Sequence, residues 1–206
     1  MVSMNKIKSI CVYCGAAPGA DTVYLEAAIA LGRLLAAEGI RLVYGGGGVG
    51  LMGATARACA EAGGKVTGII PDFLRGTEQA FEHAHELIVT QDMHERKRLM
   101  FERADAFIAL PGGIGTLEEL IEQLTWVQLN RHSKPVMALN ISHFWDPLLT
   151  LLDHMQATGF VNVARPVKLL VAHNVRAVLP KLNTALTTVG EAGLHGAAEE
   201  RVLDRM

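Results

Sequence analysis

A glycine-rich stretch directly in front of two glutamates is the first feature of this sequence with chemical potential. Residues 110–120 read LPGGIGTLEEL, in which three glycines and a threonine precede Glu118 and Glu119. The N-terminus of a helix carries partial positive charge and free N–H groups, so it suits a phosphate, but it suits a carboxylate side chain equally well. The stretch is therefore interpreted either as a phosphate-binding loop, with its glutamates free for chemistry, or as a helix cap.

The position of Glu119 on the expected helix keeps both interpretations open. Thr116 and Glu119 spell T-x-x-E, a capping box in which the glutamate bonds back to the threonine backbone. At 100° per residue, one apolar stripe packs inward and consists of Leu117, Leu120, Ile121, Leu124 and Val127. Glu119 falls on the opposite face with Gln123 and Trp126. A large aromatic side chain on an outward face indicates that another part of the structure covers that face. We expect a second subunit as this cover, which predicts a homodimer with Glu119 near a shielded cleft.

A second glycine-rich loop, YGGGGVGLMG, follows an earlier strand. Gly48, Gly50 and Gly53 match G-x-G-x-x-G, and Asp72 follows near the spacing of a ribose-binding acid, which by itself indicates NAD. Against NAD, the motif follows the second expected strand instead of the first, and another glycine loop ends a later strand. Glycines can also serve only tight turns. Because neither loop continues as G-K-[ST], a monophosphate is favoured over a magnesium-bound triphosphate.

The basic run MHERKR, residues 93–98, precedes the LPGGIGTLEEL stretch. At helical spacing Arg96 points to the edge of the protein itself and Lys97 lies on the other flank, while Arg98 pairs with Glu102 in solvent. A guanidinium held at that edge can clamp a phosphate or a ribose through its planar fork. The alternative is that the whole run is a solvated helical face.

Strands and helices alternate along the chain. Apolar segments predict strands over residues 9–15, 40–44, 65–70, 85–90, 106–110, 134–140 and 167–172. Helical periodicity predicts helices over residues 22–39, 52–63, 92–104, 116–130, 145–159 and 175–186. This alternation predicts an α/β fold with a doubly wound, mostly parallel sheet in a Rossmann-like three-layer sandwich. Ligands in such folds bind outside the carboxyl ends of the strands.

Composition and charge limit the class of protein. The chain has 206 residues, is 50% hydrophobic and carries a formal net charge of -2, which predicts one domain over residues 1–187 and a polar tail over 188–206. Since no apolar run reaches the roughly 20 residues of a membrane span and the first residues lack a signal peptide's apolar centre, we expect a cytoplasmic protein that does not bind a membrane. A sequence pI near 6.4 favours a small phosphate-bearing molecule over nucleic acid as the partner.

Cysteines and histidines do not predict a metal or redox site. Cys11 and Cys14 form a CxxC, but redox pairs open a helix and structural zinc needs four ligands, whereas SICVYCG is typical of a buried strand. His83 and His85 have no third ligand at helical or turn spacing, so we interpret them as loop residues. Neither a metal nor a cofactor is expected.

Together, YGGGGVGLMG, MHERK and PGGIGTLEE resemble the Lonely Guy (LOG) family of cytokinin riboside 5'-monophosphate phosphoribohydrolases. The resemblance covers roughly residues 8–185, and every fixed position of the family's PGGxGTxxE motif is matched. It implies a dimeric Rossmann-like enzyme without a cofactor that hydrolyses the N-glycosidic bond of a nucleoside monophosphate to free base and ribose 5-phosphate. Similar proteins are often labelled lysine decarboxylases, but a pyridoxal phosphate lysine is not found in this sequence.

The resemblance also implies which residues act. Arg96 and Glu119 take the positions of the family's catalytic pair. The expected substrate contacts are Glu78, Lys97, Gly112, Gly113, Ile114, Gly115, Thr116, Glu118 and Thr125, with Gly45, Gly46, Gly47, Gly48 and Gly50 of the first loop. Near a helix N-terminus Glu119 is expected to stay ionised, as a base or a stabiliser of the oxocarbenium-like sugar and not as an acid. The alternatives are a non-catalytic nucleotide-binding module, a general AMP nucleosidase and a nicotinamide-dependent oxidoreductase.

Overall fold

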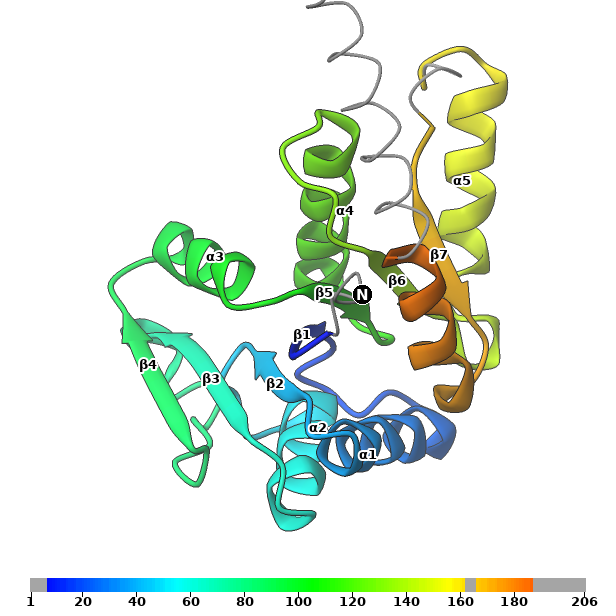
Figure 1. Cartoon of the computed structure of the whole chain (residues 1–206). Helices are drawn as coiled ribbons and strands as arrows, with labels where there is room; N and C mark the ends of the chain where they lie inside the picture. The colour runs from blue at the N-terminus through cyan, green and yellow to red at the C-terminus, as the bar shows by residue number, and fades with distance from the viewer. Residues whose placement is uncertain (1–6, 162–165, 187–206) are drawn as a thin grey trace, which may run out of the picture.

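The centre of the molecule is a seven-stranded sheet in which all paired strands run parallel (Figure 1). The computed structural model describes residues 7–161 and 166–186. The order along the sheet is β4-β3-β2-β1-β5-β6-β7. The strands are β1 (Ser9–Tyr13), β2 (Arg41–Tyr44), β3 (Val66–Pro71), β4 (Glu86–Thr90), β5 (Ala106–Ala109), β6 (Val136–Leu139) and β7 (Leu169–Ala172).

α-Helices connect consecutive strands as the sequence predicts, except that only a short 3-10 helix (Asp72–Leu74) lies between β3 and β4. The helices are α1 (Thr22–Ala37), α2 (Gly50–Glu61), α3 (Met93–Glu102), α4 (Ile114–Gln128) and α5 (Asp146–Ala157), with a further helix over residues 178–186. The predicted α/β, doubly wound fold is confirmed. Two helices begin two residues earlier than predicted, α2 at Gly50 and α4 at Ile114, and the second of these differences changes the interpretation of Glu119.

Residues on the two faces of β1 show why the sheet is covered on both sides. Val12 packs in one hydrophobic cluster with Leu31 of α1 and Leu182 of the helix over 178–186. Tyr13, the next residue, packs in a second cluster with Leu120 of α4. Successive side chains of a strand point to opposite faces, so a strand buried on both faces must be apolar throughout. In Figure 1, α1 and α2 accordingly lie on one side of the sheet and α3 and α4 on the other.

The pair α1 and α2 is packed closely through a glycine. A Cβ atom placed on Gly32 of α1 would lie 2.3 Å from the carbonyl oxygen of Thr55 on α2. Real Cβ atoms do not approach backbone oxygen so closely, so a larger residue would force the helices apart. The position of α2, and with it the loop in front of α2, therefore depends on this contact.

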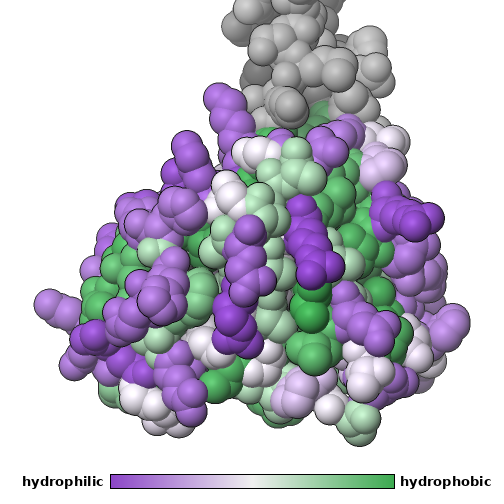
Figure 2. Space-filling model, turned by 90° about the horizontal axis from the view of Figure 1, so that it is seen from below, coloured by the Kyte–Doolittle hydropathy of each residue, from purple (hydrophilic) through white to green (hydrophobic). Residues whose placement is uncertain are grey.

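In the part of the chain that the structure describes, no helix combines the length and the hydropathy that crossing a bilayer needs. Figure 2 shows one face of the molecule, on which hydrophilic side chains lie among hydrophobic ones. The predicted polar tail over residues 188–206 lies outside the described residues.

Candidate active site

The loop after β1 lies between the two glycine-rich loops and binds to both. The Gly15 N–H donates to the Pro111 carbonyl at 3.1 Å, which connects this loop to the one after β5. The Gly15 carbonyl accepts hydrogen bonds from the N–H groups of Leu51 and Met52, at 3.0 and 3.3 Å, which connects it to α2. Since β2 and β5 flank β1, the chain reverses its sheet order here, and this is where ligands of such folds bind. Sequence reasoning missed the role of Gly15, whose signal was a glycine at the end of the first strand.

The first glycine loop, after β2, packs tightly against the protein itself. A Cβ atom on Gly48 would lie 2.3 Å from the carbonyl oxygen of Gln79, and one on Gly50 would lie equally close to the carbonyl of Ala16. Gly50 also has φ +56°, which favours glycine. These glycines thus allow the backbone of the loop to lie directly against the backbone of neighbouring segments. A contact of this loop with substrate stays a prediction.

The second glycine loop, after β5, leaves the N-terminus of α4 open. The N-cap residue Gly113 makes no side-chain cap bond, and a Cβ atom on Gly113 or on Gly115 would have no neighbouring atom within 4 Å. Ile114, the first residue of the helix, is 82% exposed. The first N–H groups of a helix have no partner inside the helix and attract an anion. Of the two loops, this one presents the freer anion site.

The capping-box interpretation of Glu119 is wrong. Because α4 begins at Ile114 with Gly113 as its N-cap, Thr116 is the third residue inside the helix and cannot be the cap. Thr116 is buried, and its hydroxyl packs so closely on Gly112 that a Cβ atom placed on Gly112 would lie 2.1 Å from it. Glu119 therefore belongs to the second turn, with its carboxylate available for another role.

Arg96 of α3 points to the carboxyl end of β2, as its helical position predicts. Its side chain is buried, and Nη2 donates to the Gly45 carbonyl at 3.3 Å. A Cβ atom on Gly45 would lie 2.1 Å from Nη2, so the guanidinium lies directly on the loop. The Nε atom is buried without a hydrogen-bond partner. Arg96 is therefore not part of a solvated face, and it keeps hydrogen-bonding capacity for an anionic ligand.

Burial raises the pKa of Glu119 from 4.5 to about 7, and the charge of Arg96 acts in the opposite direction. Glu118 and Glu78 raise this pKa further and Lys97 lowers it. The expectation that the helix N-terminus holds Glu119 ionised is therefore wrong for the protein without a ligand. Removal of water from the carboxylate outweighs the helix charge, which falls off within the first turn.

Glu78 comes to the same place from the segment between β3 and β4. Its carbonyl accepts the Gly48 N–H at 2.9 Å, and Gly47 forms an antiparallel bridge with Ala80. Burial raises the pKa of Glu78, whereas Arg96 lowers it, and the buried Oε2 atom has no hydrogen-bond partner. Arg96, Glu119 and Glu78 thus interact electrostatically as one group beside the first glycine loop.

The sequence of the chain matches a family model over residues 52–182, described as "Possible lysine decarboxylase". A cytokinin riboside 5'-monophosphate phosphoribohydrolase of Rhodococcoides fascians is 43% identical over 178 residues, which cover 86% of this chain and 90% of that protein. One of Arabidopsis thaliana is 43% identical over the same length and is covered to 78%. This chain belongs to the LOG family.

Solved structures confirm the fold of this LOG-family chain at low sequence identity. A molybdenum cofactor binding protein from Rippkaea orientalis has a TM-score of 0.65 at 24% identity, covering 87% of this chain and 98% of that one. The Moco carrier protein of Chlamydomonas reinhardtii has a TM-score of 0.66 at 23% identity, with 89% and 99% covered. At this identity the likeness shows a shared fold and no shared ligand.

Three of the predicted substrate contacts of the LOG-family chain, Lys97, Glu118 and Thr125, make contacts within the protein itself. Lys97 forms ion pairs with Glu118 and, at 3.4 Å, with Glu122, so α3 and α4 hold each other there. The Thr125 hydroxyl donates to the Ile121 carbonyl at 2.8 Å within its own helix. Twelve residues separate Thr125 from Gly113, which is about 18 Å along a helix. The chain itself does not bring Thr125 to the open end of α4.

The face of α4 that holds Glu119 is partly covered by the chain itself. Gln123, expected on an outward face, is buried, and its Oε1 atom has no hydrogen-bond partner. Trp126 packs edge-on against Phe101 of α3, with ring centroids 5.1 Å apart. α3 therefore provides part of the cover of this face. Whether a subunit covers the remainder stays a prediction.

The cysteines of the LOG-family chain behave as the sequence predicts. Cys11 and Cys14 are free and buried, and burial raises the pKa of both thiols. A thiol held protonated is a poor nucleophile, which fits the interpretation of SICVYCG as a buried strand. His83 and His85 are exposed, and within the described residues no group of three metal-ligating side chains occurs.

The raised pKa of Glu119 predicts that Glu119→Gln stabilises the protein, increasingly at higher pH. The folded state holds this proton up to about pH 7 and the unfolded chain only to about 4.5, so the wild type loses stability as pH rises between these values. Between pH 5 and pH 8 the advantage of the variant should grow by about 2–3 kcal/mol. Urea unfolding at both pH values measures it. Glu61→Gln, on the exposed side of α2, is the control and should show no such growth.

Proposed function

We propose that this chain hydrolyses the N-glycosidic bond of N6-modified adenosine 5'-monophosphates, releasing the free base and ribose 5-phosphate. Relatives with this activity in their names are 43% identical over 86% of the chain. The observation that carries the proposal is the combination, at one edge of the sheet, of an uncapped α4 N-terminus with the buried Arg96 and the half-buried Glu119. An anion site beside a carboxylate and a guanidinium suits a phosphorylated sugar whose anomeric carbon becomes cationic.

The phosphate is proposed to bind at the N-terminus of α4. Gly113 and Gly115 leave open space there, and the first N–H groups of the helix have no cap. At α2 the corresponding N–H groups of Leu51 and Met52 already bind Gly15, so the first loop contributes less to the anion site than the second. This assigns unequal roles to the two glycine loops.

Glu119 then faces the sugar, one turn inside the helix whose N-terminus holds the phosphate. As the C1'–N bond breaks, its electron pair leaves with the base, which takes up a proton from solvent, and the sugar gains positive charge that a carboxylate stabilises. Water then adds at C1' as its proton passes to Glu119. Arg96 holds oxygen atoms of the substrate and favours the ionised form of Glu119. Because the free carboxyl has a pKa near 7, kcat/KM should rise with pH up to about that value.

A homodimer is proposed to complete the binding site. Thr125 is exposed and lies about 18 Å along α4 from Gly113, so it fits a contact with substrate held by a second subunit better than one in its own. Next to it, Leu129 is 61% exposed, and a hollow of about 390 Å³ lies between Phe101, Trp126, Asn130 and Arg131. Exposed apolar surface with aromatic side chains is typical of a subunit interface.

Loss of the Glu119 carboxylate should stop turnover without preventing binding. Glu119→Ala is expected to retain nucleotide affinity and to lose about 100-fold or more in kcat, because the sugar cation loses its carboxylate. Chromatography of AMP and isopentenyladenosine monophosphate incubations measures the released base. Glu61→Gln should turn over normally.

Two outcomes would contradict the proposed reaction or its specificity. Wild-type protein that binds both nucleotides and leaves them intact would be a non-catalytic binding module. Equal release of adenine from AMP would indicate a general AMP nucleosidase.

A carboxylate at the open helix end should compete with the substrate phosphate. Gly115→Asp places an anion among the first N–H groups of α4, where a Cβ atom meets nothing within 4 Å, so the fold should be kept. We expect KM to rise by about 10-fold or more, and ribose 5-phosphate, but not ribose, to inhibit the wild type. Gly115→Ala separates charge from size and should change KM little. An equal rise in KM in both variants would contradict the proposed position of the phosphate.

The dimer is tested by light scattering. The wild type should have about twice the 22.2 kDa of one chain, and Leu129→Arg should halve the mass because it places a charge in the interface. Met155→Arg on α5, also exposed and apolar, is the control. If the wild-type protein has the mass of one chain at all concentrations, the role proposed for Thr125 is wrong.

A further inference from the structure

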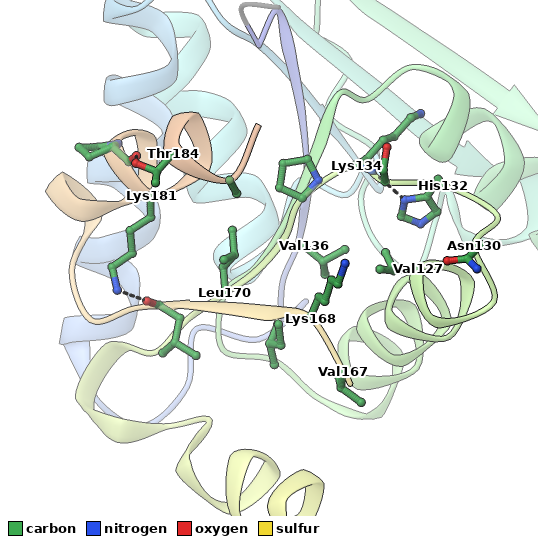
Figure 3. Close-up of a pocket in the computed structure, with 16 residues that line it drawn as sticks. Val127, Asn130, His132, Lys134, Val136, Val167, Lys168, Leu170, Lys181 and Thr184 are labelled. Carbon is green, nitrogen blue, oxygen red and sulfur yellow. Dashed lines mark hydrogen bonds between the residues drawn. The ribbon is translucent and has the colours of Figure 1, made fainter. Parts of the chain in front are cut away.

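A large groove lies away from the loops that follow β1, β2 and β5. Its volume is about 800 Å³, and it lies where β6 and β7 begin, between the C-terminal end of α4 and the helix over residues 178–186. Figure 3 shows Val136 and Leu170 on the two strands, with Val127 of α4 on one side and Thr184 on the other. β7 is the last strand of the sheet, so one side of the groove is a sheet edge.

The lining of the groove combines apolar surface with positive charge. Eight of the sixteen lining residues are valine, leucine or proline, on or next to α4, β6, β7 and the helix over residues 178–186. Three lysines, Lys134, Lys168 and Lys181, also line it, whereas none of the described residues that line it is acidic. Lys134 and Lys181 donate to the carbonyls of Phe101 and Val171, at 2.7 and 2.6 Å. Lys168 is exposed and has no ion pair among the described residues. Such a surface suits an apolar segment that carries acidic side chains.

We propose that this groove binds the chain's own segment 187–206. The segment begins directly after Leu186, and its near neighbour Ala185 already lines the groove. Binding of the segment therefore needs only a short connecting loop, which costs little conformational entropy. It contains four acidic residues and two arginines, opposite in net charge to the lysine-lined groove. Occupation by this segment would cover apolar surface beside the edge strand β7, which otherwise remains open to pairing with another chain.

The pattern of the segment fits an apolar row with acidic neighbours. Four apolar residues recur every four positions, which places them along one side of a helix: Leu194, Ala198, Val202 and Met206. Glu199 and Glu200 lie between members of this row. Residues 187–193 include Gly190 and Gly193 and can span up to about 23 Å, enough to reach back over the groove. As a helix, residues 194–206 would be about 20 Å long.

Hydrogen exchange of the full-length chain tests this binding. Amides of residues 194–206 should exchange about 10-fold or more slowly than those of a free peptide of the same sequence. Val202→Asp should remove this protection, because it places a charge on apolar surface. Lys168→Glu should weaken it, and Glu199→Lys with Glu200→Lys should restore it in that background.

The control and the contrary outcomes keep the test specific. Leu151→Asp changes an exposed apolar residue of α5 outside the groove and should leave the protection unchanged. Exchange as fast as in the free peptide would overturn the proposal, as would protection that Val202→Asp does not alter. Protection that rises with protein concentration would also overturn it, since the groove would then bind a second copy.

Discussion

The geometry of the candidate active site depends on one residue that belongs to neither glycine-rich loop. Gly15 binds Pro111 through its N–H and the start of α2 through its carbonyl, so the loops after β2 and β5 are held at a fixed distance from the loop after β1. A Cβ atom on Gly15 would lie 3.3 Å from Cα of Gly112, closer than most side chains can approach. The same hydrogen bonds occupy the N-terminus of α2. The contact therefore determines both the spacing of the two loops and which helix end stays open for an anion.

Glu119 illustrates how burial and helix charge compete at such an edge. Interaction of a carboxylate with a helix N-terminus contributes about 0.3–1 kcal/mol and falls off within one turn. A pKa raised from 4.5 to about 7 corresponds to roughly 3 kcal/mol against the ionised form, so the loss of water dominates. Arg96 opposes this cost and is itself buried with an unpartnered Nε atom. A positive charge that develops on a bound ligand would favour the ionised carboxylate, as the proposed reaction requires.

Much of the fold could be predicted because local patterns and burial agree. The β1 segment SICVY is apolar on both faces, and each predicted strand and helix has a counterpart in the structure. The errors concern where helices begin and what surrounds a side chain. α4 begins at Ile114 because Gly113, in the loop after β5, is the N-cap residue and has an extended backbone conformation. The T-x-x-E spacing does not show this. Only the family resemblance indicated Glu78, because periodicity and spacing do not show the bridge between Gly47 and Ala80 that brings its segment to the loop.

The sequence by itself determined the elements of this protein, their alternation, and the family motifs around Arg96 and Glu119, because periodicity, glycine runs and residue types are local properties of the chain. Only the tertiary structure decided which helix N-terminus is open, that Lys97 pairs with Glu118 and Glu122, and that Glu119 holds its proton to about pH 7. These properties depend on neighbours far away in sequence. Desolvation and hydrogen bonding act through space, and no spacing along the chain encodes them directly.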